Sequence, residues 1–212
     1  AGGTREPLDA VRVLTNRSSG RQGHAIAEAA ARRGANVTLL TTSPLALDEM
    51  DGCFVRRVDV ETARELHDEV VARMADADVL VMAAAVADFR PAVAAQGKLR
   101  RADGVPDVVL EPTGDVLAAA IARRRDGQVV VGFAAETTDA VERGREKLAR
   151  KGCDLLVVND VSKPGVGFDH ATNEVVILGD DGSERLVALS SKRAVAEVLL
   201  DSVGARVVAR GA

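Results

Sequence analysis

The chain has 212 residues, of which 47% are hydrophobic and 28% charged, and its formal net charge is −4. This composition is typical of one globular domain with its own core, and the negative charge gives a nucleic-acid partner no electrostatic support. The two cysteines and three histidines are scattered, so they predict neither a disulfide framework nor a metal cluster, and a cytoplasmic compartment is the simplest interpretation. No apolar run is long enough to span a membrane, and the start at Ala1 favours a fragment or a processed piece.

The first segment predicts a strand, a loop, a helix and a second strand. Val11 to Thr15 is a short β-branched run that predicts a buried strand, and Asn16 to Gly20 is a small polar loop. Ala25 to Arg33 is rich in alanine, a strong helix former, and Asn36 to Leu40 is the next strand. Together they predict a βαβ unit.

The loop before this helix has the composition of an anion site. A helix start offers unpaired N–H groups and a partial positive charge. Ser18 and Ser19 add hydroxyl donors, and Gly20 and Gly23 allow a phosphate to approach the backbone closely. The pattern S-S-G-x-x-G is neither of the familiar dinucleotide or P-loop motifs, and an ordinary tight βα turn explains it equally well.

A central parallel strand is predicted further along. Phe54 to Val58 is a strand and Glu61 to Ala75 a helix, and the fully apolar run Asp78 to Ala84 is typical of a strand buried on both faces. The small residues at its carboxyl end leave room for a planar ligand, since open α/β sheets bind ligands there. Asp88 follows and is a candidate for Mg²⁺ beside phosphates, although a turn aspartate is the more ordinary interpretation.

Residues 92–111 interrupt the alternation of strands and helices. A basic stretch containing Lys98, a turn at residues 102–104 and a short strand at 108–110 predict a hairpin flap. A lysine on such a flap could reach a phosphate, but most lysines of this kind are only solvated.

The remaining chain returns to alternating helices and strands and ends in a hairpin and a long helix. A cap at Thr113 or Asp115 begins one helix, and Lys147 and Lys151 share one face of another. A solvated basic stripe is the ordinary interpretation of that lysine pair. The predicted elements are a helix from 112 to 124, a strand at 128–133, a helix at 139–151, a strand at 154–158, a hairpin of 174–178 and 185–189, and a helix at 191–203.

These elements predict one domain, residues 1–212, with a doubly wound, Rossmann-like and mostly parallel sheet. Two excursions, near 92–111 and 163–189, have no place in such a core. An excursion that cannot bury its own apolar side often packs on a partner, so we expect a flap, a dimerisation region and a symmetric homodimer.

Four classes of protein compete for this fold. The Tyr-x-x-x-Lys pair of short-chain reductases is impossible because the chain has no tyrosine, and a hydrolase's G-x-S-x-G elbow is missing. An enzyme that handles a phosphate or a nucleotide and a non-catalytic nucleotide-binding module both remain open.

The motifs taken together are similar to those of one family. They are Gly3-Thr-Arg-Glu-Pro-Leu-Asp9, Asn16-Arg-Ser-Ser-Gly20, Ala84-Ala-Val-Ala-Asp-Phe89, Gly97-Lys-Leu-Arg-Arg101, Gly132-Phe-Ala-Ala-Glu-Thr137 and Val158-Asn-Asp160. In this order, over almost the whole chain, they resemble bacterial phosphopantothenoylcysteine synthetase, the ligase half of the bifunctional coenzyme A biosynthesis protein. The decarboxylase half is absent from this sequence. One departure is Thr113-Gly-Asp-Val116, where the family usually has Asn-Pro-Asp-Ile/Val.

The resemblance implies a magnesium- and CTP-dependent ligase that joins 4′-phosphopantothenate to L-cysteine through an acyl-cytidylate, releasing pyrophosphate and CMP. It also implies roles for particular residues: Asn16 at the acyl intermediate, Lys98 at the charge that builds up when it forms, and Asp88 at the cation. Nucleotide contacts are implied for Ser19, Gly20, Gly23, Ala83, Ala84, Ala85, Asp88, Lys98, Gly114, Asp115, Val116, Leu117, Phe133, Lys147 and Lys151.

Overall fold

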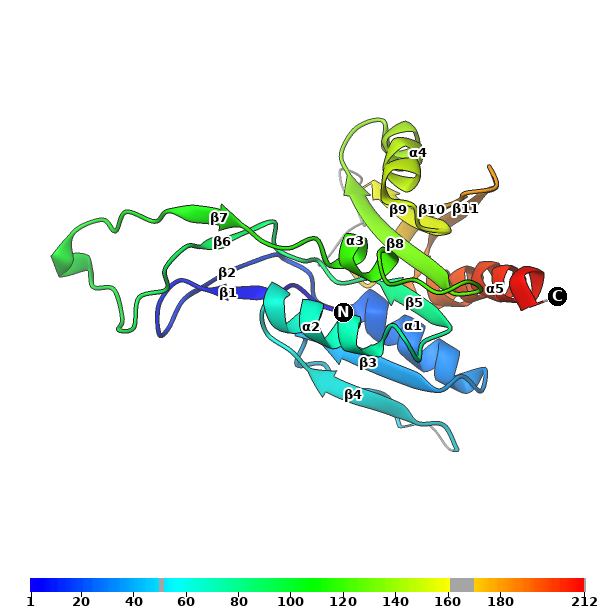
Figure 1. Ribbon diagram of the computed structural model, residues 1–212, viewed down its shortest axis with the longest axis horizontal. Helices are drawn as coiled ribbons and strands as arrows, with labels where there is room; N and C mark the ends of the chain where they lie inside the picture. The colour runs from blue at the N-terminus through cyan, green and yellow to red at the C-terminus, as the bar shows by residue number, and fades with distance from the viewer. Residues whose placement is uncertain (50–51, 161–169, 212) are drawn as a thin grey trace.

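The computed structural model describes residues 1–49, 52–160 and 170–211. It shows an α/β body from which a narrow arm projects (Figure 1). The main sheet has five strands in the order β11-β10-β9-β8-β5. Their bounds are β5 Val79–Met82, β8 Val129–Glu136, β9 Leu155–Asp160, β10 Thr172–Gly179 and β11 Glu184–Ser191.

The main sheet is mixed, which corrects the expectation of a mostly parallel one. Strands β5, β8 and β9 are parallel, whereas β10 runs antiparallel to β9 and β11 antiparallel to β10. The hairpin predicted at 174–189 is therefore present, but it extends the sheet because Val175 and Ile177 are buried in the core. The beginning of the predicted excursion, residues 163–169, lies outside the described residues.

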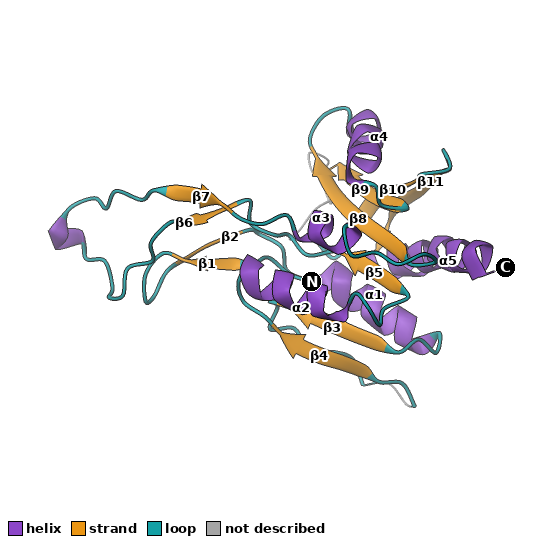
Figure 2. Cartoon of the chain, viewed as in Figure 1, coloured by secondary structure: helices purple, strands orange, loops and turns teal. Residues whose placement is uncertain are grey.

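Helices cover both faces of this sheet. The helices α1 (Arg21–Arg32) and α5 (Lys192–Gly211) pack on one face, where Ile26, Val157 and Leu199 belong to one buried cluster. The opposite face is covered by α2 (Ala63–Arg73), α3 (Val116–Ile121) and α4 (Ala140–Lys151) through two further clusters. Figure 2 shows these helices packed around the strands of the sheet. Each helix buries one apolar stripe, which explains why the apolar residues follow the predicted periodicity.

The N-terminal residues occupy the position between the two-stranded sheet and the main sheet. The parallel pair β3 (Val37–Thr41) and β4 (Val55–Asp59) forms a separate two-stranded sheet. Residues 1–4 run between β3 and β5: Thr42 N–H donates to Ala1 O at 3.0 Å, and Ala85 N–H donates to Gly2 O at 2.8 Å. This segment links the two sheets at the edge where β3 and β5 end.

The strand predicted at Val11–Thr15 is not buried, and this prediction is wrong. The strand β2 (Val13–Thr15) pairs antiparallel with β1 (Arg5–Pro7), and all three β2 residues are exposed. A β-branched run is compatible with a core strand or with a hairpin, and the pairing of β1 with β2 decides for the hairpin. Residues 5–15 are thus an insertion between the N-terminal segment and the loop before α1.

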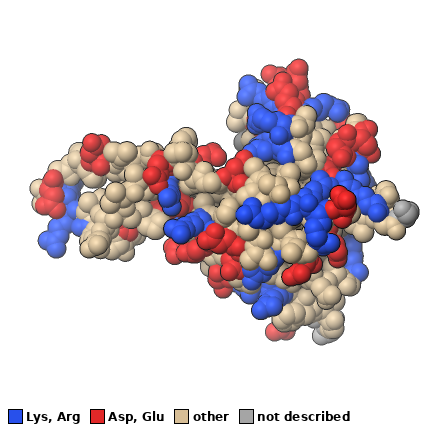
Figure 3. All heavy atoms as spheres, in the orientation of Figure 1, with Lys and Arg blue, Asp and Glu red and all other residues tan. Residues whose placement is uncertain are grey.

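The predicted hairpin flap is confirmed as the second half of the arm. The strands β6 (Phe89–Pro91) and β7 (Leu110–Pro112) pair antiparallel, and a long connection with one short 3₁₀ helix, Arg101–Asp103, joins them. Beside β1 and β2 these segments form the arm, most of which is loop in Figure 2. On the face shown in Figure 3, much of the arm carries neither acidic nor basic side chains, while charges gather over the body.

Candidate functional site

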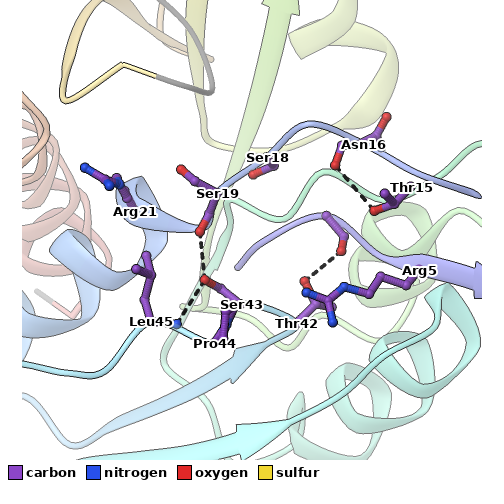
Figure 4. A pocket seen from close by; sticks show the side chains of 11 residues that line it. Arg5, Thr15, Asn16, Ser18, Ser19, Arg21, Thr42, Ser43, Pro44 and Leu45 are labelled. Carbon is purple, nitrogen blue, oxygen red and sulfur yellow. Dashed lines mark hydrogen bonds between the residues drawn. The ribbon is translucent and has the colours of Figure 1, made fainter. Parts of the chain in front are cut away.

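The hairpin of β1 and β2, the loop before α1 and the segment that follows β3 form a pocket lined mostly by polar residues. It has a volume of about 320 Å³. Figure 4 shows Asn16, Ser18 and Ser19 along one side, with Thr42 and Ser43 on the other. The lining residues are Gly3, Arg5, Thr15, Asn16, Ser18, Ser19, Arg21, Thr42, Ser43, Pro44 and Leu45.

The start of α1 has the tight geometry that the glycines predict. Gly20 is the N-cap residue and has φ of 81°, a left-handed conformation that favours glycine. The Ser43 hydroxyl donates to Ser19 O at 2.7 Å, so the loop is tied to the end of β3. Gly23 is buried, and a Cβ there would lie 2.4 Å from Ala1 Cβ and 3.7 Å from Ala83 Cβ. Both glycines therefore permit close backbone approaches at this helix start.

A buried histidine stands under the loop. His24 Nδ1 lies 3.0 Å from Gly20 O, and the side chain is buried. Burial lowers the pKa of His24 below its ordinary value, and the nearby Gly20 and Leu45 backbone only partly opposes this shift. The imidazole is therefore neutral at pH 7 and packs beneath the loop without adding charge to the pocket.

Asn16 reaches from this loop to the end of β5. Its Nδ2 donates to Ala85 O at 3.0 Å, and Ala85 is also held by the N-terminal segment. Ala83 and Ala84 are half-buried and pack against two different core clusters. The structure thus brings Asn16 to Ala85 and Gly23 to Ala83, and Ala84 lies between these two alanines in the chain.

Asp88 lies just beyond this edge. It is exposed, and its carbonyl accepts a hydrogen bond of 2.9 Å from Thr113 N–H. Thr113 in turn donates its hydroxyl to Ala87 O. These contacts connect the end of β5 to the turn that begins α3. No group of three or more His, Cys, Asp or Glu within 1–49, 52–160 and 170–211 could hold a metal ion by itself.

The segment Gly114–Leu117 forms that turn and the first turn of α3. Asp115 is the N-cap and accepts from Ala118 N–H at 3.0 Å, which decides between the two predicted caps. Burial alone would raise the pKa of Asp115, but Lys151 and the backbone donors outweigh it and hold the pKa below its ordinary value. Val116 is buried and Leu117 is half-buried near Gly132.

The two lysines of α4 lie at different places. Lys151 forms an ion pair with Asp115, whereas Lys147 Nζ lies 4.0 Å from a Glu136 carboxylate oxygen. Lys147 also borders an open pocket of about 480 Å³ lined by both acidic and basic side chains. Phe133, on β8, is half-buried and packs on the core. Lys151 therefore contacts the turn before α3, whereas Lys147 lies beside the end of β8.

No hydrogen bond or ion pair within residues 1–49, 52–160 and 170–211 joins Lys98 to another predicted site residue. It is exposed on the arm, and its neighbour Leu99 contacts Asp9 and Arg12 in the β1–β2 turn. The three residues between Arg12 and Asn16 form β2, so four steps of extended chain separate their Cα atoms, about 13 Å at 3.3 Å per residue. The sequence could not show this separation because it depends on the pairing of β1 with β2.

Several pocket residues were missed by the sequence interpretation. Thr42 and Ser43 follow β3 and could have been found from the rule that neighbouring parallel strands end at one edge. Arg5 and Arg21 carried no local signal beyond their charge. Arg5 enters the pocket because β1 leaves the N-terminal segment beside Thr42, as Figure 4 shows.

The fold and pocket define an α/β protein in which a glycine-capped helix start, the segment after β3 and several hydroxyl and basic side chains lie around one pocket. Residues 1–206 match the family described as the DNA/pantothenate metabolism flavoprotein C-terminal domain, and the chain belongs to this family.

Relatives and solved structures agree with this assignment. The chain is 46% identical over 213 residues to the coenzyme A biosynthesis bifunctional protein CoaBC of Mycobacterium tuberculosis, covering 96% of the chain and 50% of the relative. It is 41% identical over 209 residues to CoaBC of Escherichia coli K12, with 97% and 50% coverage. The chain thus spans about half the length of these relatives.

Among solved structures, the C-terminal domain of a CoaBC superposes with a TM-score of 0.78 at 34% identity, covering 96% of this chain and 90% of that one. The DNA/pantothenate metabolism flavoprotein from Streptococcus pneumoniae superposes with a TM-score of 0.80 at 22% identity, with 97% and 96% coverage, and shows likeness of fold alone. No helix in the described part of the chain is long and apolar enough to cross a membrane.

Proposed function

We propose that the chain is a phosphopantothenate–cysteine ligase that uses CTP, acting as one Rossmann-like domain in the cytoplasm. The observation that carries the proposal is the convergence of separate motifs at one edge, with Asn16 on Ala85 and Gly23 against Ala83. The relatives named CoaBC support the substrate class, because they are 46% and 41% identical over nearly this whole chain.

The proposed reaction has two steps. A carboxylate oxygen of 4′-phosphopantothenate forms a bond to the α-phosphorus of CTP, and the bond to the β-phosphate breaks and releases pyrophosphate. The amine of L-cysteine then forms a bond to the acyl carbon, loses a proton, and CMP leaves. A carboxylate and a triphosphate repel each other, so the site must hold both anions and supply positive charge.

Residues of the pocket and of the neighbouring strand and helix ends suit this task. We propose that the N–H groups at Ser19, Gly20 and the start of α1 bind phosphate, and that Asn16 donates to the acyl oxygen. Ala83, Ala84 and Ala85 would floor the nucleotide pocket, and Gly114, Asp115, Val116, Leu117 and Phe133 would surround the cytidine. Lys147 and Lys151 would reach phosphates once the nucleotide competes with Glu136 and Asp115 for them.

Asp88 fits a magnesium ion that arrives with the nucleotide. One exposed carboxylate is too few for an all-protein cage, but Mg²⁺ commonly binds through one or two carboxylates together with substrate phosphates. When bound, Mg²⁺ would supply charge neutralisation at the triphosphate. Asp88 would orient that charge beside the α3 turn.

The protein is proposed to act as a homodimer, fused in the full-length protein to a decarboxylase domain. The arm exposes large apolar side chains that a single chain leaves in water. Six of them are Val11, Val13, Leu14, Val108, Val109 and Leu110. We propose that this surface packs on a second copy and that the arm then lies over that copy's site. Lys98, which has no hydrogen bond or ion pair to a predicted site residue in the described part of its own chain, would then act there.

A pyrophosphate-release assay tests the function. Each of the four nucleoside triphosphates is supplied with Mg²⁺ and L-cysteine, with and without 4′-phosphopantothenate. We expect turnover with CTP that depends on 4′-phosphopantothenate and is far weaker with ATP. Absence of turnover with all four would favour a non-catalytic nucleotide-binding module, and a higher kcat/KM with ATP would overturn the choice of CTP.

A further inference from the structure

The carboxylate of Asp9 connects the two halves of the arm. Oδ1 accepts from Val11 N–H at 2.8 Å and from Arg12 N–H at 2.7 Å, which closes the β1–β2 turn. Oδ2 accepts from Leu99 N–H at 3.1 Å, across 90 residues of sequence, and pairs with the Arg12 guanidinium at 3.0 Å. The side chain of Asp9 has no exposed surface. One carboxylate therefore holds a turn with one oxygen and the flap with the other.

The flap segment is held to the rest of the chain at this turn. Ala95 N–H donates to Leu8 O at 3.1 Å, and the Arg12 guanidinium donates to Leu99 O. Across 1–49, 52–160 and 170–211, every hydrogen bond from residues 93–99 to other segments ends on Leu8, Asp9 or Arg12. Leu99 is thus fixed through both its N–H and its carbonyl. Lys98 directly precedes it.

The protonation state of Asp9 suits this role. Burial alone would raise the pKa of Asp9, but the N–H groups of Val11, Arg12 and Leu99 and the Arg12 charge together hold the pKa below its ordinary value. The side chain is therefore a carboxylate at neutral pH, with both oxygens available as acceptors.

We propose that Asp9 is a positioning residue for Lys98, fixing the backbone at Leu99 so that the ammonium group of Lys98 is presented from the arm in one place. This inference rests on the proposed function, in which Lys98 neutralises charge as the acyl-cytidylate forms. Asp9 touches no substrate in this account and acts only through Lys98. Its contribution is the geometric precision on which such electrostatic catalysis depends.

The variant Asp9→Asn separates the two oxygens. The one remaining oxygen can stay on the N–H groups of Val11 and Arg12, as asparagine does in Asx turns. The amide NH₂ then faces the Leu99 N–H and the Arg12 guanidinium, all of which are donors. The turn is kept while the bond to the flap is lost. Asp103→Asn is the matched control, since it removes the same charge from an exposed position of the same flap.

The first measurement is amide hydrogen exchange resolved by residue, which requires no activity. We expect the Leu99 amide to exchange at least about 10-fold faster in Asp9→Asn, because its acceptor is gone. The Ala92 amide, bonded to Val109 O at 2.9 Å at the base of the flap, should keep its rate in both variants. An unchanged Leu99 rate would overturn the proposal.

The second measurement is the pyrophosphate burst without cysteine. Asp9→Asn should lower the burst rate on the order of 10-fold, within the ~10²-fold that a 1 Å misplacement can cost. The CTP concentration that gives half of the maximal burst rate should stay nearly unchanged. In the Lys98→Gln background, Asp9→Asn should cause no further loss, since coupled residues are not additive. Additive losses, or a wild-type burst rate in Asp9→Asn, would contradict the role through Lys98.

Failure of the ligase proposal and failure of the variant to fold can both be told apart from failure of the role of Asp9. If wild-type protein releases no pyrophosphate with any triphosphate, the proposed function and the role through Lys98 both fail, and the exchange of Leu99 decides only whether Asp9 holds the flap. If Asp9→Asn does not fold, Arg12→Gln removes the second bond to Leu99 and should speed its exchange in the same direction. Unchanged exchange in that variant would also count against the proposal.

Discussion

The approach of Gly20 to Ser43 gives a quantitative test of the loop before α1. In Gly20→Ala, the new Cβ would lie 2.6 Å from Ser43 Cβ and 2.9 Å from Ser43 Oγ, closer than real Cβ contacts allow. The φ of 81° adds a second cost, since left-handed backbone costs a residue with a Cβ about 1–2 kcal/mol. Overpacking of this kind costs about 1–3 kcal/mol, so we expect a total loss of about 2–5 kcal/mol in the free energy of unfolding.

Gly34→Ala is the matched control. Gly34 follows the other end of α1 and has φ of +85°, but nothing lies within 4 Å of its added Cβ. Gly34→Ala should therefore lose only the backbone contribution of about 1–2 kcal/mol. Urea unfolding of the two variants measures the difference, which is the contact with Ser43. Ser43→Gly also removes the hydrogen bond to Ser19 O, so its own loss is measured and subtracted. The remaining loss caused by Gly20→Ala in the Ser43→Gly background should then be smaller than in the wild type, which is the rescue expected if the two side chains collide. Equal losses in both glycine variants, or no rescue, would refute the geometry of this loop.

Four further outcomes are expected. Lys98→Gln should leave the unfolding curve unchanged and lower the burst rate on the order of 10²-fold, about 3 kcal/mol, and a wild-type burst rate would remove Lys98 from the chemistry. If each site forms between two chains, a mixture of the Lys98→Gln and Asn16→Ala proteins should regain up to about a quarter of wild-type activity. Replacing Lys147 and Lys151 together with Gln should weaken CTP binding in calorimetry while stability changes by less than roughly 1 kcal/mol, and unchanged affinity would leave them as a solvated face. Light scattering at micromolar concentration should give twice the chain mass of 22.2 kDa, and a fully active monomer would contradict the dimer. Because the pKa of His24 is lowered on folding, the unfolded chain binds its proton first, so stability should fall as pH drops below about 6.5, and His24→Gln should reduce that slope in urea titrations from pH 7.5 to 5; an equal slope would show that His24 is not its source.

The elements with one buried stripe were predictable from sequence because their periodicity is local. Strand β9, which reads Leu-Leu-Val-Val-Asn-Asp, and helix α4 with its glycine end at Gly152 lie where the pattern places them. Asp115 could be predicted as a cap because capping depends on residues only three positions apart.

The pairing of strands could not be predicted in the same way. Nothing local distinguishes Val13–Thr15 as a hairpin strand from a core strand, and nothing local places β10 beside β9. These outcomes depend on contacts between distant segments and on which residues occupy the place next to β5. The same reason explains why Arg5 and Ser43 were missed, whereas the glycine and serine loop, whose signal is contiguous, was found.

The most direct test of the proposed chemistry follows one oxygen atom. 4′-Phosphopantothenate labelled with ¹⁸O in its carboxylate is converted with CTP and L-cysteine, and the masses of the products are measured by mass spectrometry. If the carboxylate attacks the α-phosphorus, one labelled oxygen must appear in CMP, because the amine displaces that oxygen together with the cytidylate. Label in inorganic phosphate with CDP as product, or unlabelled CMP, would contradict an acyl-cytidylate.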